Sequence, residues 1–172
     1  MKTHDFLLEL GTEELPPKLL LKLSESLKNN IADELKKINI SSSRIVSFAT
    51  PRRLAVSITE LQSKQKDQVI EKKGPLIESP EMAINGFTKS CGVDLSQLEK
   101  KQLGGKEYYF YSKEETGQNI SNLLPKIIES SIKNIPITRA MKWGSADHTF
   151  VRPVHWLVVM LDKELYFIFS VN

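Results

Sequence analysis

The spacing of hydrophobic residues predicts two long amphipathic helices. The first stripe consists of six aliphatic side chains at intervals of three and four residues: Leu20, Leu23, Leu27, Ile31, Leu35 and Ile38. Pro16 and Pro17 precede this stripe and fit the first turn of a helix, where the missing amide donors have no partner. A second stripe over 119–135 predicts another helix, in which Pro125 requires a kink or a start close to Ser121.

Alternating apolar and polar positions predict strands around these helices. Residues 5–10, "DFLLEL", form the first, and 45–49 followed by "TPRRLAVSITEL" resembles a hairpin. In the second strand of that hairpin, Leu54, Val56 and Ile58 point away from Arg53, Ala55 and Ser57. The segment "FVRPVHWLVVMLDKELYFIF" predicts two strands joined at Asp162-Lys163, the first of them inside a sheet because both its faces are apolar.

The segment 67–116 predicts a small strand–helix–hairpin module. A polar strand, "DQVIEKKGP", ends at Gly74-Pro75, and a hairpin turns at Gly104-Gly105. Between them a helix starts at Ser79-Pro80-Glu81, with Ser79 as its cap and Pro80 in its first turn, and ends near Gly92. We therefore expect an α+β fold: a mixed or antiparallel sheet with packed helices, formed by 1–66 and completed by 117–172, with 67–116 inserted.

Composition narrows the possible functions. Cys91 is the only cysteine of the 172 residues, and the three histidines lack metal-ligand spacing, so we expect neither an internal disulfide nor a metal centre. There is no glycine-rich phosphate loop and no serine nucleophile elbow. The longest apolar run, Trp156 to Leu161, is too short for a membrane span, and the N-terminus does not resemble a signal peptide, so we expect a cytoplasmic protein. The net charge of +3 and pI near 8.9 permit contact with nucleic acid without arguing for it.

Two charged groups in the first third of the chain have open interpretations. Arg52 and Arg53 begin a strand and either remain solvated or ion-paired, or grip phosphate oxygens with the guanidinium fork. The acids Glu9, Glu13 and Glu14 precede the first helix, whose dipole they would favour, and catalysis is the weaker interpretation.

Residues 139–156 combine basic and aromatic side chains in a pattern that can hold RNA by phosphate pairing and base stacking. The residues concerned are Arg139, Lys142, Trp143, His148, Phe150, Arg152, His155 and Trp156. Trp156 alternates with Val154 and Val158, which predicts a core position, and His155 is interpreted as a buried, hydrogen-bonded histidine. The exposed candidates are therefore Arg139, Lys142, Trp143 and Arg152. The aromatic run Tyr108–Tyr111 predicts strand packing rather than a stacking platform.

Four segments, in this order, resemble the β subunit of bacterial glycyl-tRNA synthetase. They are "LLELGTEELPP", "FATPRRLAV", "GFTKSCGV" and "MKWGSADHTFVRPVHWL". The resemblance implies an α2β2 ligase that joins glycine to its tRNA, with ATP and magnesium at the α subunit and tRNA-binding regions in β. It identifies this chain as an N-terminal part of β, which agrees with its end inside an alternating apolar run. The part alone is expected to have no catalytic residues, no cofactor and no activity.

On this resemblance the expected partners are the α subunit, glycine tRNA and a second β subunit. The matching positions expected to contact RNA or a subunit are Arg52, Arg53, Lys142, Trp143 and Arg152, with Arg139 beside them. Two rival hypotheses remain open. One is a structural adaptor that holds β to α or to the rest of β, never touches RNA, and exposes an apolar patch instead of a basic one. The other is a self-contained enzyme in which Glu9, Glu13 or His155 converge in one pocket.

Overall fold

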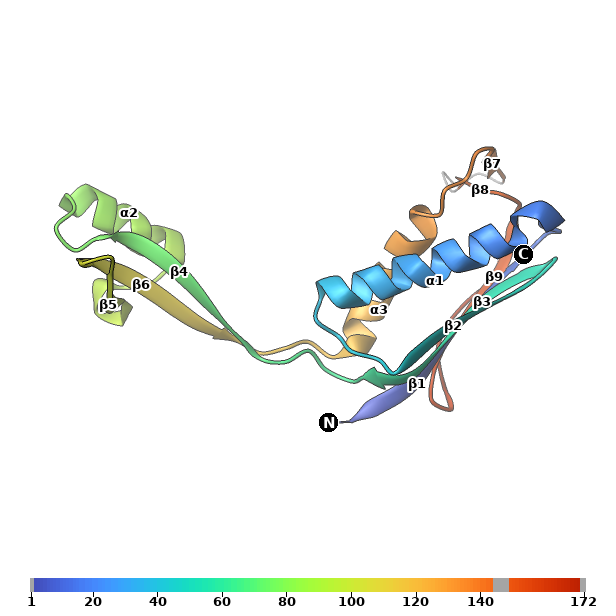
Figure 1. Ribbon diagram of the computed structural model, residues 1–172, viewed down its shortest axis with the longest axis horizontal. Coiled ribbons are helices and arrows are strands. Elements are labelled where there is room, and N and C mark those ends of the chain that lie inside the picture. Colours follow the sequence, from blue (N-terminus) through green and yellow to red (C-terminus); the bar gives the residue numbers. More distant parts are fainter. Residues whose placement is uncertain (1, 144–148, 171–172) are drawn as a thin grey trace. The chain divides into compact units, whose positions relative to one another are not determined.

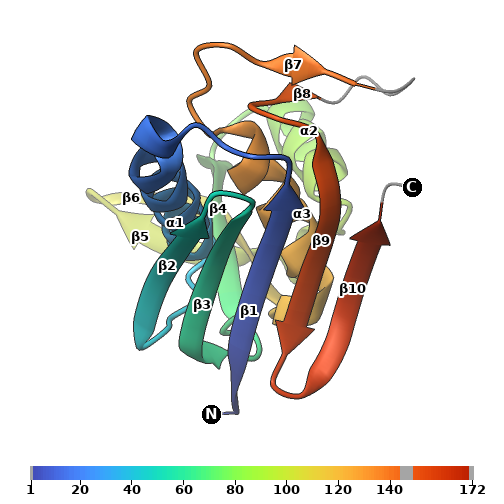
Figure 2. The same cartoon turned by 90° about the vertical axis from the view of Figure 1, so that its right-hand side faces the viewer.

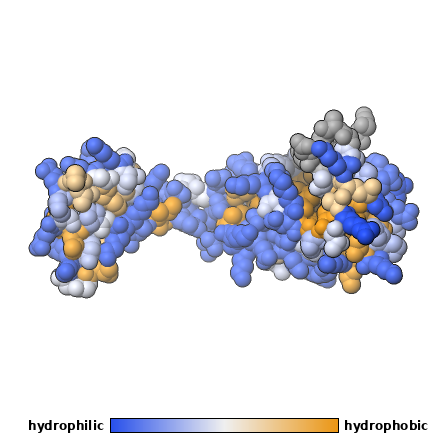
Figure 3. All heavy atoms as spheres, turned by 90° about the horizontal axis from the view of Figure 1, so that it is seen from above, coloured by the Kyte–Doolittle hydropathy of each residue, from blue (hydrophilic) through white to orange (hydrophobic). Residues whose placement is uncertain are grey.

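A computed structural model describes residues 2–143 and 149–170, with side chains as far as Tyr166. The chain divides into two compact units. Unit 1 comprises Met1–Gln65 with Gln118–Asn172, and unit 2 comprises Lys66–Gly117. Figure 1 labels the elements of both units. In the space-filling view of Figure 3, hydrophilic residues cover most of the visible surface of each unit, with hydrophobic patches between them.

Unit 1 is built on a five-stranded antiparallel sheet. Its strands are β1 (Thr3–Thr12), β2 (Arg44–Thr50), β3 (Arg53–Gln62), β9 (Val154–Leu161) and β10 (Glu164–Ser170), in the order β10-β9-β1-β3-β2. The predicted hairpin of β2 and β3 is confirmed, and β9 lies inside the sheet as its two apolar faces indicate. A two-stranded ribbon pairs β7 (Met141–Lys142) with β8 (Thr149–Phe150).

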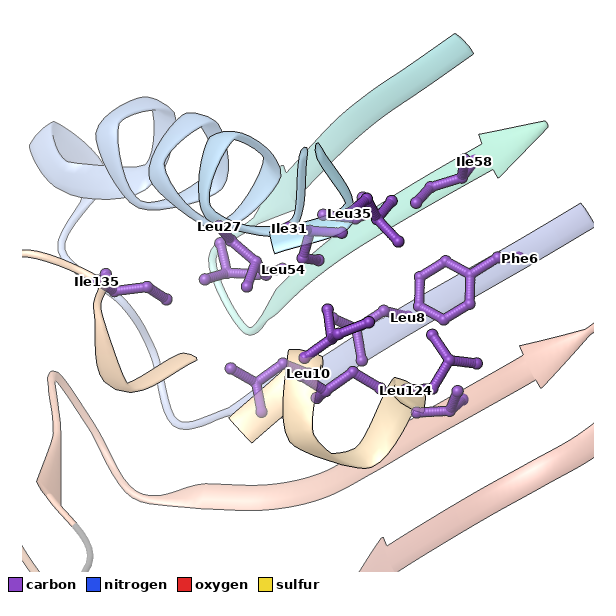
Figure 4. Close-up of a cluster of buried hydrophobic side chains, with 14 of the residues drawn as sticks. Phe6, Leu8, Leu10, Leu27, Ile31, Leu35, Leu54, Ile58, Leu124 and Ile135 are labelled. Atoms are coloured by element: carbon purple, nitrogen blue, oxygen red, sulfur yellow. The ribbon is translucent and has the colours of Figure 1, made fainter. Parts of the chain in front are cut away.

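Two helices pack on one face of this sheet, and Figure 2 shows them behind the strands. A short 3-10 turn at Pro17–Leu19 leads into α1 (Leu20–Lys37), and α3 spans Ile120–Lys133. Alternate residues of β1 meet the apolar stripes of both helices in the core drawn in Figure 4. The core therefore lies between the helices and one face of the sheet, so the helices leave the opposite face uncovered.

Pro125 lies inside α3, which begins within a residue of the predicted start at Ser121. Proline has no amide hydrogen, so the carbonyl of Ser121, four residues earlier, lacks its usual helical donor. The hydroxyl of Tyr166 donates to that carbonyl at 2.5 Å. Strand β10 is thereby tied to α3 at the point where the helix lacks a bond.

Unit 2 consists of a three-stranded antiparallel sheet, β4-β6-β5, and one short helix. The elements are β4 (Gln68–Leu76), α2 (Glu81–Cys91), a 3-10 turn (Leu95–Gln97), β5 (Glu99–Leu103) and β6 (Lys106–Glu115). The hairpin turn is confirmed, because Gly104 and Gly105 adopt φ of +62° and +79°. The fold is therefore α+β, with antiparallel sheets throughout the described residues.

Two predictions for unit 2 were wrong in detail. Gly74-Pro75 does not end the strand: β4 continues to Leu76 with a register shift after Lys73, which an edge strand tolerates. A Cβ at Gly74 would lie 2.5 Å from the Phe87 ring, so the glycine serves helix packing rather than a turn. Ser79 does not cap α2 either, since Pro80 occupies the N-cap position without a side-chain bond.

Candidate functional site: a charged cluster on an apolar sheet face

The face of the unit 1 sheet that points away from the helices is largely apolar. Cross-strand register places Phe48, Ala55, Glu9 and Val158 in one row, and Val46, Ser57, Leu7, Met160 and Leu165 in the next. We call six of these residues the apolar sheet face: Leu7, Val46, Phe48, Val158, Met160 and Leu165. Phe48 is 57% exposed and Leu165 52% exposed. Strands of a sheet with one solvent-exposed face normally place polar residues on that face. The apolar composition seen here is typical of an interaction surface.

A third row, at one end of this face, contains a tryptophan whose ring packs over a glycine. The register sets Arg53 opposite Gly11 and Gly11 opposite Trp156. A Cβ at Gly11 would lie 1.9 Å from the nearest indole atom of Trp156, so the ring occupies the space that any larger residue would need. The glycine of "LGTEE" is therefore required by the close approach of the indole ring.

Glu9 lies between the two side chains of this row. Its Oε1 accepts a hydrogen bond from Trp156 Nε1 at 2.9 Å and lies 3.3 Å from Arg53 Nε. The guanidinium carbon of Arg53 is 5.9 Å from the indole centroid, within the range of a cation–π contact. Glu9 thus holds the indole and the guanidinium together at one end of the apolar sheet face.

Glu13 forms a second set of contacts next to the first. His155 Nε2 lies 2.9 Å from Glu13 Oε1, and Arg52 Nη2 lies 4.0 Å from Glu13 Oε2. We call the six residues of the two sets the Glu–Arg cluster: Glu9, Glu13, Arg52, Arg53, His155 and Trp156. Its two arginines and two glutamates balance in formal charge, which weakens any attraction to phosphate.

Arg152, just before β9, contacts two other segments of the chain near this cluster. Its Nε donates to the carbonyl of Glu14 at 3.3 Å, and Nη1 contacts the sulfur of Met141 at 3.1 Å. Arg152 thereby ties the "GTEELPP" segment and β7 to the start of β9. Its polar contacts are with this chain itself, which is a positioning role.

The remaining candidates from the sequence do not join the cluster. Arg139 and Lys142 are exposed, with Lys142 in β7. Trp143 is packed against the core and half-buried, so the expectation that it is exposed was wrong. His148 lies outside the described residues. The structure brings together Arg52 and Arg53, and Arg152 lies beside Glu14 of the same acidic segment.

The predictions that Trp156 is a core residue and that His155 is buried were wrong, whereas the predicted hydrogen bond of His155 is present, to Glu13 at 2.9 Å. Thr12 pairs with Val154 whereas Gly11 pairs with Trp156, so β9 has one extra residue at this point. Such a bulge reverses the alternation. Val154 packs against the core and Trp156 lies on the opposite face, while the side chain of His155 keeps 37% exposure.

The sequence suggested that the acids favour the dipole of the first helix, but the contacts of Glu9 and Glu13 are with other groups. The 3-10 turn after them and the first turn of α1 contain no acid, and Glu9 and Glu13 pair instead with arginine, histidine and tryptophan. They converge on the open sheet surface, where the side chain of Glu13 is 47% exposed. Among the described residues, no group of three or more His, Cys, Asp or Glu side chains could hold a metal ion, and no helix is long and apolar enough to cross a membrane.

The fold and the cluster define an α+β protein whose antiparallel sheet has a largely apolar face, opposite the helices, with a charged cluster at one end. A model of the family described as glycyl-tRNA synthetase beta subunit matches residues 6–169, so the chain belongs to this family. It is similar to the glycine–tRNA ligase β subunits of Coxiella burnetii (strain Dugway 5J108-111; 44% identity), Klebsiella pneumoniae (strain 342; 38%) and Hahella chejuensis (strain KCTC 2396; 37%). Each match covers 96% of this chain and 25% of the relative, so the chain spans about a quarter of the length of these relatives.

Proposed function

We propose that unit 1 is a protein-docking part of a glycine–tRNA ligase β subunit and that its apolar sheet face binds the α subunit. The observation that carries this proposal is the row pattern of that face, in which exposed or half-buried aliphatic and aromatic side chains replace the expected polar ones. Depletion of charge and enrichment of apolar side chains is typical of the core of a protein–protein interface.

The pairing of the arginines supports a protein partner over RNA at this surface. Arg52 and Arg53 each lie within 4.0 Å of a glutamate, so neither brings an unmatched positive charge. A charged, hydrogen-bonded group beside an apolar patch resembles the polar rim of an interface. The Glu–Arg cluster would then fix orientation and the apolar sheet face would supply affinity.

The activity that we propose for the whole assembly follows its relatives' names and the family. Two α and two β subunits would attach glycine to its tRNA at the expense of ATP in the cytoplasm, with ATP and magnesium held by the α subunit. In this assembly the present chain supplies contacts and no catalytic group, so we expect it to be inactive alone.

The test is the affinity of the chain for the α subunit, measured by analytical ultracentrifugation or by surface plasmon resonance with the α subunit immobilised. The double variant Phe48→Thr/Leu165→Thr removes two exposed apolar side chains while retaining strand propensity. We expect at least tenfold weaker binding. The matched control is Leu21→Gln/Met82→Gln, which removes two equally apolar side chains that are 75% and 86% exposed on helices. Unchanged affinity of the sheet variant, or an equal loss in the control, would contradict the proposal.

A second test separates docking from RNA binding. The double variant Arg52→Ala/Arg53→Ala should leave the salt dependence of binding to a glycine tRNA transcript unchanged, because these charges are already matched by glutamates. A slope of log affinity against log salt that falls by about 1.4 to 1.8 would instead place two phosphates on this pair.

A further inference from the structure

The sheet of unit 2 has two faces of different charge, and the strand register separates them. Residues directly opposite each other in an antiparallel pair share a face. Lys73 lies opposite Phe110, Glu99 opposite Phe110, and Lys101 opposite Tyr108. These residues, with Glu71, form what we call the paired face. The alternate positions, Lys72 opposite Tyr111, Lys100 opposite Tyr109 and Lys113 opposite Ile70, form the other face.

On the paired face the lysines interact with groups of this same chain. Lys101 forms ion pairs with Glu71 and, at 3.2 Å, with Glu99. The pKa of Lys101 is raised, chiefly by its hydrogen bond to Glu71 and next by its hydrogen bond to Glu99. The hydrogen bond from Lys101 in turn lowers the pKa of Glu99. Lys73 Nζ lies 3.8 Å from the Tyr108 ring centroid. These positive charges are therefore largely used within the unit.

On the other face three lysines surround one aromatic ring. The ring belongs to Tyr111 on the central strand β6. Lys72 on β4 lies directly opposite Tyr111, Lys113 lies two residues further along β6, and Lys100 on β5 is diagonal to Tyr111. Diagonal neighbours in a sheet are about 7–8 Å apart. All three lysines are exposed and Tyr111 is half-buried. We call these four residues the lysine face: Lys72, Lys100, Tyr111 and Lys113.

The lysine face has no acidic partner within its unit, whose residues are all described. No carboxylate there forms an ion pair with Lys72, Lys100 or Lys113. Two acids share this side of the sheet: Glu115 lies two residues from Lys113 along β6 and Glu107 is diagonal to Lys100, each about 7–8 Å away, and neither forms an ion pair with these lysines. Unit 2 has eight lysines and nine acidic residues, so the positive face results from the arrangement of charge and not from its sum.

We propose that the lysine face binds an unpaired segment of RNA, with phosphates on the three lysines and a base stacked on Tyr111. Three unmatched ammonium groups attract a backbone with one charge per nucleotide, and an aromatic ring between them offers a surface to any base. An acidic protein would use the charges but would gain little from the ring. The inference goes beyond the docking role of unit 1, because it concerns other residues and another partner.

The experiment measures binding of the whole chain to a fluorescein-labelled ten-nucleotide oligouridylate and to a glycine tRNA transcript across a salt series. Lys72→Gln/Lys100→Gln/Lys113→Gln should weaken binding at least tenfold and reduce the slope of log affinity against log salt by about 2, at roughly 0.7 per phosphate. The matched control, Lys73→Gln/Lys101→Gln/Lys106→Gln, removes the same charge from the side of the paired face, which Lys106 shares because it lies two residues from Tyr108 on β6, and should keep the slope. Urea unfolding of both triple variants checks that they remain folded.

A third variant tests the aromatic ring. Tyr111→Leu keeps an apolar strand residue and every charge, so it should lower affinity for the oligouridylate about five- to hundredfold at unchanged slope. RNA affinity retained by the lysine-face triple variant, an equal loss in the paired-face control, or no binding to either RNA at low salt would each overturn the inference. Binding of the same variants to the α subunit is measured in parallel, so failure here is distinguishable from failure of the docking proposal.

Discussion

The two units of this chain leave different kinds of sheet surface uncovered. Unit 1 buries one face of its sheet under two helices, with Leu8, Leu54 and Val56 fully inaccessible, and its opposite face is apolar with its nearby charges paired. Unit 2 buries only Leu98, Tyr109 and Phe110 among its hydrophobic side chains, and one of its faces carries unmatched lysines. This difference is the basis of the two proposals: a protein partner for unit 1 and an RNA partner for unit 2.

The largest expected effect tests the depth of the unit 1 core. Leu8→Ala removes a fully buried side chain, so it should lower the free energy of unfolding by about 2–5 kcal/mol, as measured by urea titration. Leu21→Ala, at a position that is 75% exposed, should change it by no more than about 0.5 kcal/mol. Similar values for the two variants would show that the helices do not cover the sheet as described.

The next effect concerns the packing of Trp156 on Gly11. Gly11→Ala inserts a methyl group where the indole lies, and such overpacking should cost about 1–3 kcal/mol in unfolding free energy. In the background of Trp156→Ala the same change should cost much less, because the obstructing ring is gone. If the cost is the same in both backgrounds, the ring does not occupy the position described here.

Two glycines of unit 2 should respond with opposite signs. Gly104 has φ of +62°, so Gly104→Ala should destabilise the hairpin by about 1 kcal/mol. Gly86 lies inside α2 with nothing within 4 Å of an added Cβ, so Gly86→Ala should stabilise by up to about 1 kcal/mol. Both changes in stability are measured as shifts in the thermal unfolding transition of unit 2 within the whole chain. Destabilisation by both changes would argue against the position of α2.

The smallest effect is a pH-dependent contact at the turn between β9 and β10. The hydrogen bond from the His4 ring, then that from the Asp5 amide, lowers the pKa of Asp162. A lowered carboxyl pKa stabilises the fold above the unfolded value and loses that contribution as pH falls through the folded value. Asp162→Asn, which tolerates the local φ of +53°, should therefore be less stable than the native chain at pH 7 and equal to it near pH 2. A difference that persists at pH 2 would assign the effect to something other than charge.

Local patterns predicted most of the elements, because each depends on residues close in sequence. The stripe of α1, the alternation of β3 and the diglycine turn needed no long-range information. The sheet order depended on β9 pairing with β1, about 150 residues away, and a single pattern cannot reveal that. The small strand–helix–hairpin segment was recognisable because Gly92 and the diglycine turn mark its element ends.

The candidate site was predictable only in part. Arg52 and Arg53 stood out by type, but their pairing with Glu13 and Glu9 depends on the register between β1 and β3. Trp156 was assigned to the core because it alternates with Val158, but both residues lie on the open face, and a strand with two apolar faces does not reveal which face the helices cover. The split of lysines between two faces of unit 2 also depended on register, because consecutive lysines point to opposite sides.

The most direct test of this account crosses two variants with two partners. The sheet variant Phe48→Thr/Leu165→Thr and the lysine-face variant Lys72→Gln/Lys100→Gln/Lys113→Gln are each titrated with the α subunit and with the glycine tRNA transcript. The account predicts that the first variant loses only the α subunit and the second loses only the salt-dependent RNA affinity. The division of roles between the two units would be contradicted if either variant lost affinity for both partners. It would also be contradicted if both variants kept full affinity for both partners.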